Sequence, residues 1–100
     1  MRGGWVYIVT NRPNGTLYIG MTSDIARRIW QHKQRRGSQF ARLYGLDRLV
    51  WYERHDDIRV AIQREKTMKH WTRAWKVRLI LAHNPDWTDL YDDFRGSPAL

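Results

Sequence analysis

Two tyrosines lie on the arms of a short hairpin near the start of the chain, in the stretch WVYIVTNRPNGTLYIG. Side chains alternate between the two faces of a strand, and residues directly opposite each other in an antiparallel pair share a face. The alternation predicts a register with Tyr7 opposite Tyr18 and the aliphatic residues of both arms on the other face. The two phenols should therefore lie together, either as simple strand formers or as hydroxyls placed for chemistry.

An arginine and a histidine follow in TSDIARRIWQHK, four residues apart. Ser23 is the expected N-cap of a helix whose buried stripe is marked by Ile25 and Ile29. Arg28 and His32 flank that stripe on one side. An arginine in this position either extends its guanidinium along the core to solvent or meets an anion.

A carboxylate falls in the middle of an apolar helical face later in the chain. Glutamate is rarely buried without a partner, so Glu65 should pair with an arginine, remain uncharged, or bind a hard cation through its oxygens. Farther on, Asn84 precedes Pro85, which disfavours helical geometry in the residue before it. Asn84 should therefore end a helix, either as a left-handed cap or as part of a site.

These residues require a small scaffold, and the pattern predicts an α+β fold. It is a single small domain, a three-stranded antiparallel sheet flanked by helices in the order β-β-α-β-α-α. The strands are expected near 5–10, 16–20 and 48–54, the helices near 24–36, 57–70 and 73–83, and a helical turn near 38–44. We expect one domain over residues 1–100, with a core of about 5–94 and a flexible tail at 95–100. The last helix should direct Trp75, Leu79 and Ala82 inward.

The charge and the composition of the chain indicate which class of partner it binds. The chain has 100 residues, a net charge of +8 and no cysteine, and its pI is about 10.4. Such an excess of cations indicates a polyanion, most often nucleic acid, although basic residues also serve solubility. The absence of cysteine, of an apolar run near 20 residues and of a secretory signal favours a cytoplasmic protein without a membrane partner.

Taken together, the pattern resembles the GIY-YIG endonuclease family, in its small standalone bacterial form, from about residue 5 to residue 94. The matching positions are Trp5-Val6-Tyr7 and Tyr18-Ile19-Gly20 for the two triplets, Arg28 and His32 on the next helix, Glu65 within REKTMKHW, and Asn84 within NPDW. Two positions depart from the family: Trp5 replaces the leading glycine, and Met21 stands where some relatives have a lysine that can assist proton transfer.

The resemblance implies a metal-dependent endonuclease that hydrolyses phosphodiester bonds, with DNA favoured over RNA and low sequence specificity. One Mg²⁺ or Mn²⁺ on Glu65 would stabilise the leaving 3′ oxygen, and Arg28 would neutralise the phosphoryl oxygens. Tyr7 would contact the attacking water, with its pKa lowered from about 10 by the arginine and the metal. His32 would accept the proton in turn, Tyr18 would position the phosphate, and Asn84 completes the family's catalytic set.

Six basic residues are expected to line the approach for the phosphate backbone: Arg27, Arg35, Arg36, Lys69, Arg73 and Lys76. The alternative function is a catalytically inactive nucleic-acid-binding module on the same scaffold. A third interpretation is a structural or regulatory interaction protein whose basic surface serves solubility. A core-facing Glu65 weighs against the pure binding module, because a carboxylate contributes nothing to binding a polyanion.

Overall fold

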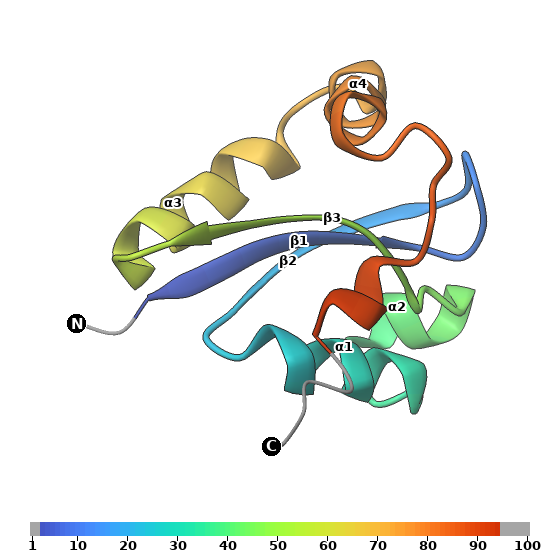
Figure 1. Cartoon of the computed structure of the whole chain (residues 1–100), viewed down its shortest axis with the longest axis horizontal. Coiled ribbons are helices and arrows are strands. Elements are labelled where there is room, and N and C mark those ends of the chain that lie inside the picture. Colours follow the sequence, from blue (N-terminus) through green and yellow to red (C-terminus); the bar gives the residue numbers. More distant parts are fainter. Residues whose placement is uncertain (1–2, 95–100) are drawn as a thin grey trace.

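A three-stranded antiparallel sheet with helices on both faces forms the centre of the molecule (Figure 1). The computed structural model describes residues 3–94, so the tail expected at 95–100 lies outside the described residues. The elements are β1 Gly4–Thr10, β2 Leu17–Thr22, α1 Ile25–Lys33, α2 Gln39–Tyr44, β3 Arg48–His55, α3 Ile58–Lys69, α4 Arg73–His83 and a short 3-10 helix, η1, Leu90–Asp93. The strand order is β2-β1-β3. The predicted α+β architecture is confirmed.

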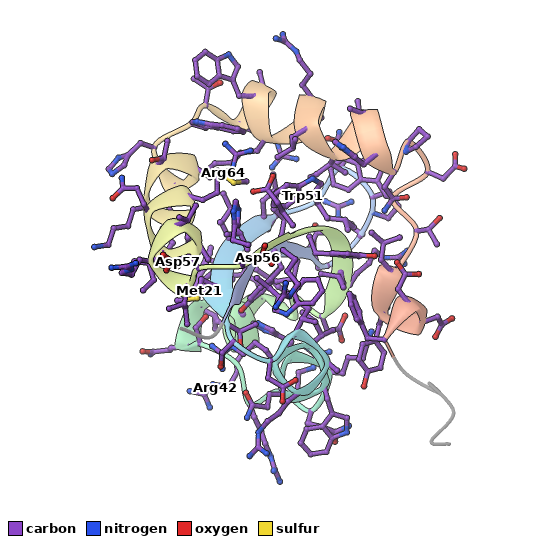
Figure 2. The ribbon with its side chains drawn as sticks, turned by 60° about the vertical axis from the view of Figure 1, so that its left-hand side comes forward. Met21, Arg42, Trp51, Asp56, Asp57 and Arg64 are labelled. Carbon is purple, nitrogen blue, oxygen red and sulfur yellow. The ribbon has the colours of Figure 1, made fainter. Side chains whose placement is uncertain are left out.

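The alternation along β1 builds a core on each face of the sheet. On one face Val6 and Ile8 pack with Ala61 and Met68 of α3 and with Ile80 of α4. Trp51 of β3 belongs to the same core, and Figure 2 shows it between the sheet and α4.

The other face of β1 carries the tyrosine. Tyr7 and Val9 pack with Ile25 and Ile29 of α1 and with Ala41 of α2. Since β1 is the central strand, its side chains are covered from both sides, and every residue from Val6 to Thr10 is buried. Among residues 3–94, no helix is long and apolar enough to cross a membrane.

The hairpin register differs from the predicted one by two residues. Tyr7 lies opposite Gly20, and Tyr18 lies opposite Val9. Because side chains alternate with a period of two, this displacement leaves every residue on its predicted face. The two-faced hairpin is therefore confirmed, and the direct Tyr7–Tyr18 pairing is wrong. The turn selects the register through a hydrogen bond from the Thr16 amide to Asn11 Oδ1, which periodicity alone does not encode.

Two further expectations are corrected at the helices. Asp24, not Ser23, is the N-cap of α1, and its side chain accepts a hydrogen bond from the Arg27 amide. On α4, Ile80 is the buried residue, whereas Trp75 and Ala82 are exposed. The Trp75 ring instead lies edge-on to Trp71, with centroids 5.9 Å apart.

The segment after α4 crosses the β3 edge of the sheet and ends beside α1 (Figure 1). Trp87 packs in the core beneath α4, and Leu90 and Tyr91 pack against the opposite core. Asp89 fixes the crossing, because its Oδ1 accepts hydrogen bonds from the Leu49 and Tyr91 amides. Its other carboxylate oxygen pairs with the ammonium of Lys33 on α1.

Asp89→Ala should lower the free energy of unfolding by about 1–3 kcal/mol, since it leaves two amides without their acceptor and removes the carboxylate paired with Lys33. Urea denaturation of parent and variant measures the change. Asp86→Ala removes an exposed carboxylate from the same segment and should change stability by less than about 0.5 kcal/mol. Equal effects of the two substitutions would contradict the anchoring role of Asp89.

Candidate active site

The hydroxyl of Tyr7 is the centre of a small hydrogen-bonded cluster. Tyr7 is fully buried, and its Oη lies 2.9 Å from His32 Nε2. Arg28 Nε donates to the same oxygen over 3.2 Å. Arg28 and His32 lie one turn apart on α1, on the side of the helix that faces β1, so both reach one phenol. The sequence predicted that Arg28 and His32 lie on one side of the helix. In the structure both side chains also contact the hydroxyl of Tyr7.

His32 is held as a neutral base. Burial, together with the nearby charge of Arg28, lowers its pKa from 6.5 to about 4. Arg28 donates to the Tyr7 oxygen, so the phenolic O–H is free to donate to His32 Nε2. With the Tyr7–His32 hydrogen bond assigned in this direction, the ring proton lies on Nδ1. That atom is buried without a hydrogen-bond partner among residues 3–94, and a Cβ on Gly37 would lie only 2.4 Å from it.

Burial raises the pKa of Tyr7 to about 12. The hydrogen bond and the charge of Arg28 lower that pKa, and the charges of Tyr18 and Glu65 raise it. Arg28 thus lowers the pKa of Tyr7 as predicted, but burial raises it by more. The combined effect of the arginine and a metal ion stays a prediction. The cost of removing a phenolate from water exceeds the stabilisation that one partly buried guanidinium supplies.

Gly20 provides the space that Tyr7 occupies. Gly20 is the cross-strand neighbour of Tyr7, and a Cβ there would lie 2.3 Å from the Tyr7 hydroxyl oxygen and 2.4 Å from Cζ. The phenol thus lies across β2 over a residue without a side chain. Contact this close with the rigid ring excludes alanine at position 20 unless the ring moves. The final glycine of the second triplet accordingly has a steric role, which the sequence pattern did not reveal.

Tyr18 lies beside this cluster on the edge strand. It is half-buried, and its ring centroid is 6.0 Å from that of His32 and 6.4 Å from that of Phe40. The guanidinium of Arg28 is steadied by Gln31, whose Oε1 accepts from Nη1 over 3.1 Å. Gln31 was not predicted, although its spacing of three residues from Arg28 on one helix was a usable signal.

Glu65 approaches from the opposite face of the sheet. It lies on α3, with 18% of its side chain exposed, and its Oε2 is 3.3 Å from Lys69 Nζ. The ion pair considered for Glu65 therefore exists with a lysine, not with an arginine. Its charge acts on Tyr7, so α1 and α3 contribute to one site from the two sides of β2. Glu65 could hold a divalent ion as a single carboxylate, because Mg²⁺ commonly keeps several waters and takes one or two carboxylates. Within the described chain, no group of three or more His, Cys, Asp or Glu side chains forms a fuller metal cage.

Asn84 lies apart from this cluster in its contacts. It is 5% exposed, and its Nδ2 donates to the carbonyls of Val50, at 3.1 Å, and Thr88, at 2.8 Å. Its Oδ1 accepts from the Thr88 amide at 3.0 Å. With φ of −151° it is not a left-handed cap. These hydrogen bonds tie the end of α4 to β3 and to the C-terminal segment.

The six basic residues expected at the nucleic-acid surface fall into two groups. Arg27, Arg35 and Arg36 are exposed on α1 and the loop after it, whereas Lys69, Arg73 and Lys76 lie on α3 and α4. Four of the six have protein partners. Arg35 lies 3.8 Å from an Asp47 carboxylate oxygen, and Arg73 donates to the Asn14 carbonyl. Lys69 pairs with Glu65, and Arg36 lies over the Trp30 ring.

The chain that carries this sheet, two tyrosines, an arginine, a histidine and a glutamate also matches a known family of domains. Residues 3–78 match the GIY-YIG catalytic domain, and the chain belongs to this family of nucleases. Asn84 lies beyond the matched residues.

The relatives are named UPF0213 proteins. One from Aeromonas salmonicida is 33% identical over 88 residues, which are 87% of this chain and 63% of that protein. One from Staphylococcus saprophyticus is 33% identical over 76% of this chain and 92% of its own length. The solution NMR structure of the UPF0213 protein of Bacillus halodurans has a TM-score of 0.54 and 29% identity, covering 87% of this chain and 92% of that one.

The buried, neutral His32 should make stability depend on pH. Its pKa is lowered in the folded state to about 4, whereas an unfolded histidine titrates near 6.5. Above about pH 6.5 the imidazole of His32 is neutral in both the folded and the unfolded state. As the pH falls toward about 4, the imidazole becomes protonated in the unfolded state but stays neutral in the folded state, so the free energy of unfolding decreases.

His32→Gln keeps an acceptor for Tyr7 and does not titrate, so its stability should decline less over this window. Urea denaturation at several pH values between about 7.5 and 4 compares the two proteins. Parallel pH profiles would show that His32 is not held neutral.

Proposed function

We propose that this protein is a metal-dependent endonuclease that hydrolyses phosphodiester bonds in nucleic acid, with DNA as the favoured substrate and low sequence specificity. The observation that carries the proposal is the Tyr7 hydroxyl, which contacts a neutral imidazole and a guanidinium at once. Family membership supplies the reaction class. Tyr7 and His32 could transfer a proton, and Arg28 provides a cation. Phosphodiester hydrolysis benefits from both proton transfer and a cation at the phosphate.

Tyr7 and His32 would act as a proton relay. With a pKa near 12, Tyr7 is not a standing phenolate at neutral pH. Tyr7 is buried in the free protein, so the attacking water would have to enter beside its hydroxyl together with the substrate. Tyr7 would then accept a proton from that water while its own proton passes to His32 Nε2, 2.9 Å away. The imidazole then becomes an imidazolium, and no free phenolate forms at any stage. Burial keeps His32 available as the acceptor, because it is neutral before the reaction begins.

Arg28 and Tyr18 would bind the scissile phosphate. The guanidinium of Arg28 donates one hydrogen bond from Nε to Tyr7 and one from Nη1 to Gln31. Among the described residues, Nη2 has no hydrogen-bond partner. Nη2 is therefore open to an anion, and the two existing hydrogen bonds fix its direction. Tyr18 lies beside His32 on the edge strand, where its hydroxyl can position the phosphate against this fork.

Glu65 would hold one Mg²⁺ or Mn²⁺, with waters completing the coordination. The ion, when bound, stabilises the charge on the leaving 3′ oxygen. The fit rests on the single hard carboxylate and on the ammonium of Lys69, which shows that this position already accommodates a cation. Asn84 would act indirectly, by fixing the position of α4 and of the segment that follows it.

The two groups of basic residues would guide nucleic acid to the β2 edge from both faces of the sheet. Arg27, Arg35 and Arg36 approach from the α1 side, and Lys69, Arg73 and Lys76 from the side of α3 and α4. With a net charge of +8, association driven by phosphate contacts and counterion release is expected, without readout of base sequence.

Glu65→Gln keeps the shape of the side chain and removes its charge, so it should lower cleavage by about 10² or more while nucleic acid still binds. The measurement is nicking of supercoiled plasmid, with single-stranded DNA and RNA in parallel, with and without Mn²⁺. Thermal melts show that the variant is folded. Cleavage equal to the parent would remove the metal role of Glu65, and binding without any cleavage by the parent would support the inactive binding module.

Tyr7→Phe should lower single-turnover nicking by about 10²–10⁴, the usual contribution of general acid–base assistance. Tyr52→Phe is a matched control, because Tyr52 lies directly opposite Tyr7 on β3. Its hydroxyl bonds to Asp93 at 2.7 Å, and burial followed by that hydrogen bond raises its pKa to about 12 as well. The control should retain activity within a few-fold. Wild-type rates for a folded Tyr7→Phe protein would rule out the relay.

A further inference from the structure

The side chain of Lys69 joins the two sides of the candidate site. It leaves α3 and places its ammonium 3.3 Å from Glu65 Oε2. The same ammonium lies 5.9 Å from the centroid of the Tyr18 ring on β2. An exposed lysine four residues after a glutamate often forms a helix-surface pair of little consequence. Here the lysine also reaches across to the edge strand, toward the ring that is proposed to position the phosphate.

This placement sets up a competition for one carboxylate. Glu65 is 18% exposed, and no other carboxylate or imidazole among the described residues joins it in a cluster of three. The Lys69 ammonium, 3.3 Å from Oε2, and a divalent ion would therefore compete for the same carboxylate. With both present at close range, their repulsion is strong enough to change metal affinity severalfold, even near the surface.

We propose that Lys69 is an internal cation that occupies Glu65 in the metal-free protein and moves to the substrate phosphate when the divalent ion binds. The proposal rests on the nuclease function proposed above. The flexible four-carbon stem allows the move, because the ammonium is already within reach of both the carboxylate and the Tyr18 ring. Lys69 thus weakens metal binding in the free protein and adds a cation at the phosphate in the complex.

Removing the charge of Lys69 should strengthen metal binding but weaken cleavage. A purely structural ion pair would not produce these two opposite effects. Lys69→Met keeps a long apolar side chain and removes the charge. It should tighten binding of Mn²⁺ about tenfold in the absence of nucleic acid. Nicking at saturating Mn²⁺ should nevertheless fall, because the phosphate loses a cation. Lys69→Arg should retain the weak metal binding of the parent.

The decisive experiment is a titration of nucleic-acid-free protein with Mn²⁺, followed by the electron paramagnetic resonance signal of the free ion. Lys66→Met is the matched control, since Lys66 is exposed on the same helix and its removal changes the net charge equally. We expect tighter binding for Lys69→Met and less than about a twofold change for Lys66→Met. Equal changes in the two variants, or unchanged or weaker binding in Lys69→Met, would overturn the proposal.

A Glu65→Gln arm separates this inference from the proposed function. If Glu65→Gln binds Mn²⁺ as well as the parent does, Glu65 is not the metal ligand and the proposed site itself fails. If Glu65→Gln loses binding while Lys69→Met matches Lys66→Met, the metal site stands and only the role of Lys69 is overturned.

Discussion

The candidate site depends on one buried hydroxyl, that of Tyr7. The residue lies on the central strand, where both faces of the sheet are covered, so the hydroxyl has no access to bulk water and needs partners within the protein. A buried hydroxyl without a partner costs about 1–3 kcal/mol. His32 and Arg28 meet that need, and the groups that would carry out the chemistry are also the groups that make this core position tolerable. Core and candidate site are consequently one structure.

The positions without side chains are as important as the side chains. Gly20 lies beneath the phenol and Gly37 lies against the imidazole, each so close that a Cβ would fall within 2.4 Å of a ring atom. The two rings are thereby held in contact by backbone on both sides. Backbone moves less readily than a side chain, so the Tyr7–His32 distance is set before any substrate arrives. Pre-set geometry of this kind is what a proton relay requires.

The charges of the site are arranged so that they do not cancel. Arg28 donates hydrogen bonds to the neutral oxygens of Tyr7 and Gln31. Glu65 is paired with Lys69 on the other side of the sheet. A direct Arg28–Glu65 pair would neutralise both the phosphate-binding cation and the proposed metal ligand. The two residues lie on α1 and α3, which pack against opposite faces of the sheet. A polyanion approaching this edge would meet Arg28 without first having to separate it from Glu65.

The sequence by itself determined the order of the elements and the two faces of the hairpin, and it nominated the residues of the candidate site. Period-two alternation and helical spacing record which side of an element is buried, and they placed Tyr7 and Tyr18 on one face and Arg28 beside His32. Periodicity does not distinguish registers that differ by two residues, so the turn had to place Tyr7 opposite Gly20. It also does not set the rotation of a helix against a sheet, which is why Ile80 is buried and Trp75 is exposed. The pKa of Tyr7 and the ammonium on Glu65 depend on burial and on contacts between α1, β2 and α3. Only the tertiary structure decides these properties, because desolvation and proximity arise when distant segments pack together.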